Sequence, residues 1–186
     1  MSKNIVLIRF SSRDLGNCAG IAQYLTNYHS TDFVQSFKID NNIVVPCGGC
    51  NYECLKPGAK CLSITENHTQ IMDAVCQADL VYFIIPNYCG FPPASCYAFN
   101  ERSVGYFNKN RELMGKYRNV PKKFIIVSNT EGQNFESLIQ SQVTGNPELI
   151  YLKTSKYKKI STAGDLMESD EAKADLMAFL NPNSVK

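Results

Sequence analysis

Four cysteines gather in one short stretch, PCGGCNYECLKPGAKC, which spans residues 46–61. Thiolate ligands suit zinc or an iron–sulfur cluster, and neighbouring thiols also oxidise reversibly to disulfides. Glycine and proline between the thiols let the backbone fold back on a ligand. The stretch therefore predicts a metal site, a cluster or a redox-sensitive loop, and leaves these alternatives open. The cysteines are Cys47, Cys50, Cys54 and Cys61, half of the eight in the chain.

Length, composition and net charge limit the kinds of protein to which this stretch can belong. With 186 residues, 44% apolar and 19% charged, residues 1–186 are expected to form one soluble globular domain. The net charge of +2 gives no reason to expect nucleic acid as a partner. No run is long enough for a membrane span, and the first residues lack a signal-peptide cleavage pattern. We therefore expect a cytoplasmic protein with no membrane partner, whose thiols stay reduced.

Short apolar runs alternate with helical patterns along the chain. Runs with little alternation indicate strands buried on both faces, as in a parallel sheet. Alternating strands and helices predict a three-layer α/β fold, and five strands in this length suit the flavodoxin-like strand order 2-1-3-4-5. A long segment at 40–66, which holds the four cysteines, interrupts the pattern as an insertion. The expected strands are 5–10, 33–39 at a sheet edge, 80–85, 124–128 and 148–152, and the expected helices are 20–28, 71–78 and 172–180.

Three loops follow strands at the edge where such sheets bind ligands. The first, SSRDLGNCAG at 11–20, combines hydroxyls, an arginine and a helix start, which suits a phosphate group or simple helix capping. The second, PNYCGFPP at 86–93, offers Tyr88 as an aromatic face and Gly90 for close backbone approach, or forms an ordinary turn. The third, SNTEGQNFES at 128–137, offers backbone donors to a ring edge, or caps a helix.

Taken together, these loops resemble the flavodoxin-like family of NAD(P)H-dependent FMN reductases, over about residues 3–179. Ser11, Arg13, Gly16 and Asn17 match the family's phosphate loop, where Cys18 replaces the usual hydroxyl residue. The family's Pro-x-Tyr-x-Gly loop is matched by Pro86, Tyr88 and Gly90. The resemblance implies that FMN contacts Ser11, Ser12, Arg13, Gly16, Asn17, Cys18, Pro86, Asn87, Tyr88, Cys89, Gly90, Asn129, Thr130, Glu131 and Gly132.

One branch of that family, the iron–sulfur flavoproteins, binds a 4Fe–4S cluster through closely spaced cysteines. This chain reads Cys-x2-Cys-x3-Cys-x6-Cys, which is one residue longer between Cys50 and Cys54 than the branch motif. The resemblance implies a possible 4Fe–4S cluster on Cys47, Cys50, Cys54 and Cys61.

The implied activity passes electrons from NAD(P)H through FMN to a quinone, a flavin or a protein acceptor. Hydride transfer to flavin requires no catalytic acid or base from the protein, so none is expected. Two alternatives stay open: a flavodoxin-type electron carrier without its own substrate, and a regulatory protein that has lost FMN and binds zinc.

Other expectations concern surfaces. The resemblance implies a homodimer, for which the aromatic residues Phe91, Tyr97, Phe99 and Tyr106 are candidate interface residues. The histidines at 29 and 68 are expected to face solvent or cap helices, and the lysines at 122 and 123 to lie on a solvated face.

Overall fold

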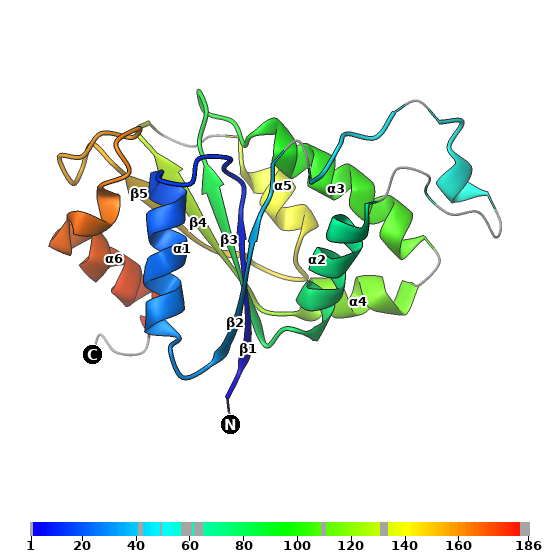
Figure 1. Ribbon diagram of the computed structural model, residues 1–186, viewed down its shortest axis with the longest axis horizontal. Coiled ribbons are helices and arrows are strands. Elements are labelled where there is room, and N and C mark those ends of the chain that lie inside the picture. The colour runs from blue at the N-terminus through cyan, green and yellow to red at the C-terminus, as the bar shows by residue number, and fades with distance from the viewer. Residues whose placement is uncertain are drawn as a thin grey trace.

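The protein is described by a computed structural model that covers residues 2–40, 43–48, 50–56, 61, 65–108, 111–130 and 134–182. Five parallel strands form one sheet in the order β2-β1-β3-β4-β5, with helices on both sides (Figure 1), so the predicted flavodoxin-like fold class is confirmed. The strands are β1 (Asn4–Arg9), β2 (Phe33–Lys38), β3 (Leu80–Pro86), β4 (Lys122–Ser128) and β5 (Glu148–Lys153).

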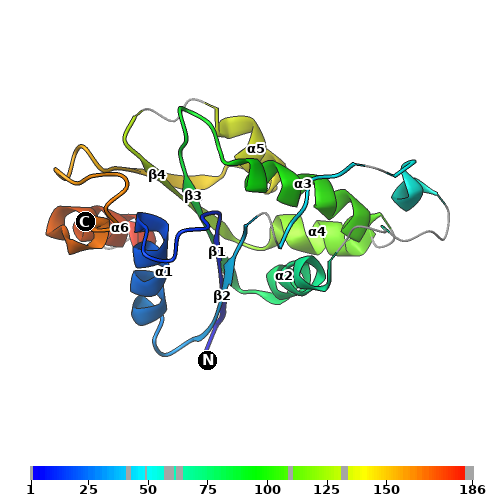
Figure 2. The same ribbon diagram turned by 45° about the horizontal axis from the view of Figure 1, so that its top comes forward.

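Helices cover both faces of the sheet (Figures 1 and 2). In the part of the chain that the structure describes, two helices pack on one face and four on the other, and two short 3-10 turns, η1 (Glu53–Leu55) and η2 (Leu166–Glu168), lie in the connections. On the first face lie α1 (Asn17–Tyr28) and α6 (Asp170–Leu180), and on the second lie α2 (Glu66–Gln77), α3 (Ala94–Phe107), α4 (Arg111–Asn119) and α5 (Glu136–Ser141).

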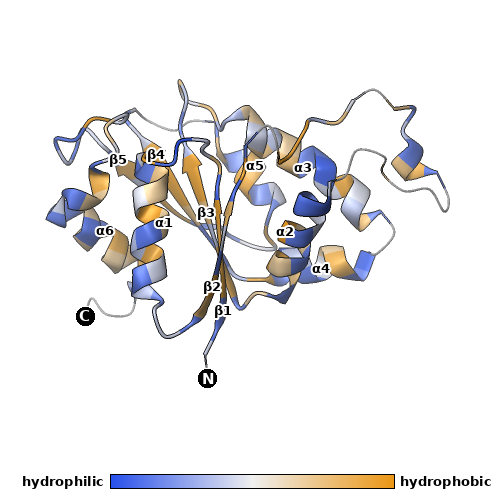
Figure 3. Ribbon diagram, in the orientation of Figure 1, coloured by the Kyte–Doolittle hydropathy of each residue, from blue (hydrophilic) through white to orange (hydrophobic). Residues whose placement is uncertain are grey.

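The alternation of side chains along β1 explains why helices are needed on both faces. Ile5 and Leu7 point into the core beneath α1 and α6, while Val6 and Ile8 point into the core beneath the other helices. All four are fully buried. Figure 3 shows the strands as mostly apolar, with hydrophilic residues at some of their ends, and the helices as two-sided. The expected strands therefore agree with the structure within two residues at each end, and β2 lies at an edge as predicted.

Lys122 and Lys123 correct one expectation, because both are buried at the start of β4 and do not form a solvated face. The Lys122 ammonium donates to the carbonyls of Tyr117 and Val120 at the end of α4, and burial lowers its pKa to about 8. The Lys123 ammonium donates to the Phe179 carbonyl at 2.9 Å, at the end of α6. Each cation therefore satisfies carbonyls that a helix leaves without partners at its C-terminus.

The expectation that His68 faces solvent is wrong, because this residue, in the first turn of α2, is 1% exposed. Its ring lies against Phe99, with centroids 5.2 Å apart. Neither ring nitrogen has a hydrogen-bond partner among the described residues. Burial, aided by the nearby Arg102 charge and opposed by the Phe99 backbone, lowers the pKa of His68 to about 4. His29, at the end of α1, is instead paired with Asp32 at 2.9 Å.

We expect His68 to make the fold sensitive to acid. The unfolded chain takes up a proton on this ring near pH 6.5, whereas the folded chain resists protonation until about pH 4. The free energy of unfolding should therefore fall as the pH drops from 6.5 to 4, by up to about 3 kcal/mol from this group. Urea unfolding of His68→Leu should show a clearly smaller loss between pH 7 and pH 4.5.

The control is Met72→Leu, which changes another buried position of α2 without removing a titratable group. It should retain the pH dependence of the parent protein. Equal pH dependence in His68→Leu and the parent would show that the buried imidazole does not carry this acid sensitivity.

Candidate functional site

The loop between β1 and α1 exposes donors at the carboxyl edge of the sheet. Helix α1 begins after Gly16 with no side chain capping its N-terminus, and it carries no acidic residue in its first turn. The first N–H groups and the helix dipole there attract an anion. Ser11 is buried beneath the loop, while Ser12 and Arg13 are exposed beside it. The phosphate site on this loop stays a prediction.

Asn17 and Cys18 belong to this loop, but their side chains serve the fold. The Asn17 amide is 3% exposed, donates to the Ser161 carbonyl at 3.0 Å and accepts from the Leu166 N–H at 3.0 Å. The Cys18 thiol lies in the core beneath α1, and burial raises its pKa to about 12. A phosphate would therefore meet their backbone N–H groups and not their side chains.

The segment after β5 closes against this loop, a contact that the sequence analysis missed. Arg13 donates to the Thr162 carbonyl at 3.4 Å, in addition to the Asn17 contacts. Gly164 has a φ of +83°, and a Cβ there would stand 2.0 Å from the Leu15 carbonyl oxygen. Only glycine therefore allows the two backbones to lie this close.

The loops after β3 and β4 are joined by Asn87, which is buried. Its side chain donates to the Ser128 hydroxyl at 2.7 Å and accepts from the Gly90 N–H at 2.8 Å. The Thr130 N–H also donates to the Ser128 hydroxyl, at 3.0 Å. Asn87 is thus a positioning residue that holds two site loops in register. Of the other residues expected in the third loop, Asn129 is exposed, and Glu131 and Gly132 lie outside the described residues.

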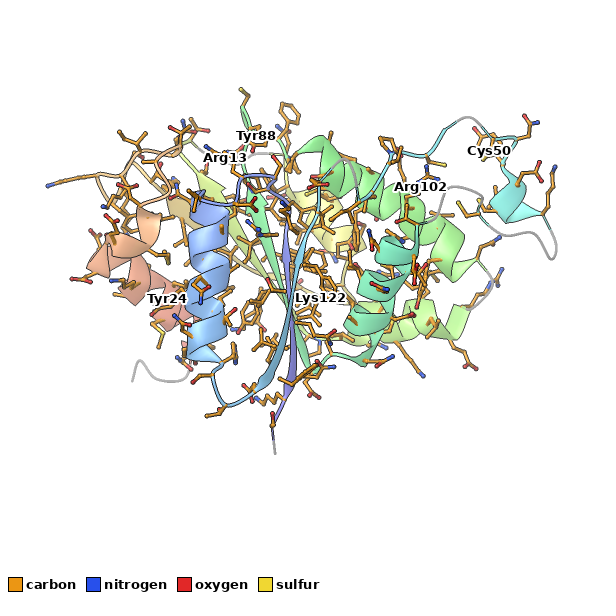
Figure 4. The ribbon with its side chains drawn as sticks, in the orientation of Figure 1. Arg13, Tyr24, Cys50, Tyr88, Arg102 and Lys122 are labelled. Atoms are coloured by element: carbon orange, nitrogen blue, oxygen red, sulfur yellow. The ribbon has the colours of Figure 1, made fainter. Side chains whose placement is uncertain are left out.

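Tyr88 stands at the tip of the second loop. Tyr88 and Phe91 exchange two backbone hydrogen bonds of 2.9 and 3.0 Å, so Cys89 and Gly90 form a two-residue turn at positive φ. Both aromatic rings are about half exposed. Pro86 ends β3, as expected. Figure 4 shows Tyr88 and Arg13 at the same edge of the sheet.

A pocket of about 220 Å³ lies between the first two loops. It brings together Ser11 and Ser12 from one side and Tyr88 from the other, and the start of α3 closes it. The edge thus offers anion donors, hydroxyls and an aromatic ring to one ligand. Its lining residues are Phe10, Ser11, Ser12, Ile39, Asp40, Tyr88, Pro93, Ala94 and Ser95.

The four clustered cysteines lie elsewhere, beyond the second half of α3 (Figures 1 and 4). All four line one pocket of about 480 Å³ against Glu101, Arg102, Val104 and Gly105. Burial raises the pKa of the Cys54 thiol, and the other three cysteines act in the same direction. Among the described residues, however, no group of three or more His, Cys, Asp or Glu side chains is arranged to hold a metal ion.

Arg102 anchors this segment, and sequence reasoning missed it. Its guanidinium, 3% exposed, donates to the carbonyls of Val45 and Pro46 at 2.6 Å each, and lies 3.6 Å from the Cys61 sulfur. The Glu101 carboxylate accepts the Cys47 N–H at 2.9 Å. The sequence did contain a signal for this anchor. Arg102 comes three residues after the core residue Phe99, so it lies near the same helix face, and a buried cation needs hydrogen-bond partners.

Comparisons with known proteins agree with the fold. No protein-family model and no curated protein matches the chain. Among solved structures, it is similar to the Trp repressor binding protein from Bacillus subtilis, with a TM-score of 0.61, 13% identity and 98% of each chain covered. It is also similar to FerB, a flavoenzyme NAD(P)H:(acceptor) oxidoreductase from Paracoccus denitrificans, with a TM-score of 0.57, 13% identity and 96% of each chain covered.

A third similar structure is an azoreductase from Bacillus anthracis, with a TM-score of 0.55 and 16% identity, covering 98% of this chain and 96% of that one. At these identities the likeness establishes the fold. In the part of the chain that the structure describes, no helix has the length and apolar character needed to cross a bilayer. The cytoplasmic location stays a prediction.

We expect Gly164→Ala to disturb the contact between the two loops. The new methyl group would collide with the Leu15 carbonyl and would also require an unfavourable positive φ, so unfolding should become easier by about 1–3 kcal/mol or more. The control is Gly145→Ala, since Gly145 also has a positive φ but no atom within 4 Å of the added Cβ. Equal destabilisation of the two variants in urea unfolding would show that the loop contact is not close.

We expect Arg102→Met to release the cysteine segment. The variant keeps the apolar stem but loses two backbone hydrogen bonds, so alkylation of the partly buried Cys61 by iodoacetamide should accelerate several-fold. Mass spectrometry measures each rate, with the exposed Cys89 as internal reference. Arg118 lies on a different helix, α4, and Arg118→Met, which removes one bond to the Val143 carbonyl, should leave these rates unchanged. Unchanged rates in Arg102→Met would exclude the anchoring role.

Proposed function

We propose that this protein is an FMN-dependent oxidoreductase that takes electrons from NAD(P)H and passes them to a quinone, a flavin or a protein acceptor. One observation carries the proposal: the loop that leads to the uncapped N-terminus of α1 contributes Ser11 and Ser12 to one pocket with the exposed Tyr88, at the carboxyl edge of the sheet. Two of the similar structures named above are an NAD(P)H:(acceptor) oxidoreductase and an azoreductase, which supports the same class of activity.

The residues present fit FMN. The backbone N–H groups of Asn17 and Cys18, the hydroxyls of Ser11 and Ser12, and Arg13 would hold the phosphate. Tyr88 would cover the ring, with Gly90 allowing backbone to approach it, and the third loop would meet the ring edge. Bound FMN supplies the capacity to accept hydride and release electrons. The chain's own part is to bind, orient and exclude water, and no side chain is assigned a proton transfer.

The proposal is tested by mixing FMN-loaded protein with NADH or NADPH without oxygen. Flavin absorbance should bleach with one of the two, and Arg13→Ala should bind FMN roughly 10- to 150-fold more weakly, as expected for the loss of a charge-assisted hydrogen bond. Arg111→Ala, on the distant helix α4, is the control and should bind normally. Tight FMN binding without bleaching would indicate the electron carrier instead, and unchanged binding in Arg13→Ala would remove the phosphate from this loop.

An iron–sulfur flavoprotein is a second candidate, favoured by the observation that all four clustered cysteines line one pocket. One zinc ion needs its sulfurs about 2.3 Å from a single point, whereas a cluster distributes its thiolates over several irons. The Arg102 cation, with a nitrogen 3.6 Å from the Cys61 sulfur, would offset the negative charge of the thiolates that hold such a cluster.

Iron and acid-labile sulfide measured on anaerobically purified protein test this candidate. We expect about four of each per chain, lost in Cys54→Ala and retained in Cys76→Ala, whose thiol does not line the pocket. Protein with neither iron nor zinc, and with four freely titrating thiols, would leave the segment as a redox-sensitive loop.

We also propose a homodimer. Of the four aromatic residues considered for an interface, Phe91 and Tyr97 are 52% and 43% exposed, whereas Phe99 is core and Tyr106 is partly buried. Two exposed aromatic side chains beside the site support an interface there. Light scattering that gives the mass of one chain, 20.8 kDa, at micromolar concentration would contradict it.

A further inference from the structure

A further pocket, distinct from the two described above and remote from the carboxyl edge, lies between α3, α4 and α5. Its volume is about 350 Å³, at the lower end of the range for small-ligand sites. Val104 also lines the cysteine pocket, whereas none of the four clustered cysteines and none of the residues implied in FMN contact is among its lining residues. Its lining residues are Asn100, Ser103, Val104, Phe107, Asn108, Arg111, Met114, Tyr117, Arg118, Ser141 and Gln142.

The body of the pocket is apolar. Phe107 and Tyr117 are buried and contact each other edge to face, with ring centroids 5.2 Å apart. Val104 and Met114 are 54% and 42% exposed at its walls. Two large apolar side chains left open to solvent, above two buried rings, form a surface that a flat or compact apolar group would cover.

The polar groups of the pocket are held in place by one another. The Tyr117 hydroxyl donates to the side-chain oxygen of Gln142 at 2.6 Å, and the side-chain nitrogen of Gln142 donates to the side-chain oxygen of Asn100 at 3.0 Å. This chain of bonds fixes Asn100 through its oxygen and leaves its amide nitrogen as a donor. A small number of fixed polar groups within an apolar pocket is typical of sites that orient a ligand.

The charged side chains that line the pocket are positive. Arg111 and Arg118 line it, and no carboxylate is among its lining residues. The Lys122 ammonium lies 4.4 Å from the centre of the Tyr117 ring and adds to the positive field. Arg118 uses one nitrogen for the Val143 carbonyl at 3.1 Å, which holds the guanidinium while its other N–H groups stay available. Guanidinium groups bind carboxylates, sulfonates and phosphates through paired N–H donors.

We propose that this pocket binds a small amphipathic organic anion, with an aromatic or compact apolar body between Val104, Phe107 and Met114 and its anionic group on Arg111 and Arg118. The site is separate from the proposed FMN site, so the inference stands or falls independently of the oxidoreductase proposal. Charge complementarity and the matched apolar walls favour such a ligand over a neutral one.

The test compares two fluorescent probes of nearly the same shape. 8-Anilinonaphthalene-1-sulfonate carries an anionic group, and N-phenyl-1-naphthylamine lacks it. The double variant Arg111→Met/Arg118→Met keeps the apolar stems but removes both charges. We expect it to bind the sulfonate roughly tenfold more weakly while binding the neutral probe as before. Val104→Trp, which fills the pocket, should weaken both probes.

The control variant Lys116→Met/Lys173→Met removes two surface charges that do not line the pocket. It should bind the sulfonate as the parent does. Equal weakening in the control would show that net charge and not this pocket governs binding, and would overturn the proposal. Unchanged sulfonate binding in the double arginine variant would overturn it as well.

Discussion

The whole arrangement depends on a sheet whose central strands are buried on both faces. Neither β3 nor β4 has an exposed residue, so apolar side chains point alternately into two separate cores. Helices must then cover both faces. Every connection between parallel strands runs from the carboxyl end of one strand back to the amino end of the next. The loops that carry hydroxyls, amides and Tyr88 meet at the carboxyl edge for this reason.

Buried polar side chains, each hydrogen-bonded to another segment, then fix those loops. Asn17 holds the segment after β5, Asn87 joins the loops after β3 and β4, and Arg102 holds the cysteine segment on α3. Such groups are expensive to bury unpaired, so each specifies one arrangement of its partner. Helix α3 starts at the proposed FMN pocket and reaches the cysteines about 15 Å further along, and so connects the two regions physically.

The strands and the place of two site loops were predictable from sequence, because they depend on the local pattern of apolar and polar residues. The apolar runs predicted all five strands and their order, and the loops at 11–20 and 86–93 were expected at one edge, where they are found. The burial of His68, Lys122 and Lys123 was not predicted, because a polar residue type favours solvent unless its partners are known. Those partners are carbonyls at helix ends and an aromatic ring, which are brought close only by tertiary packing.

For the same reason, sequence could name Asn17 as a site residue without showing that its amide faces another loop. The central claim is that the start of α1 holds the phosphate of FMN. Calorimetric titration of the apoprotein with FMN and with riboflavin, which differ only in that phosphate, tests it most directly. The account predicts that FMN binds at least about a hundredfold more tightly, since the phosphate would gain several charge-assisted bonds. Equal affinities for the two flavins would contradict it.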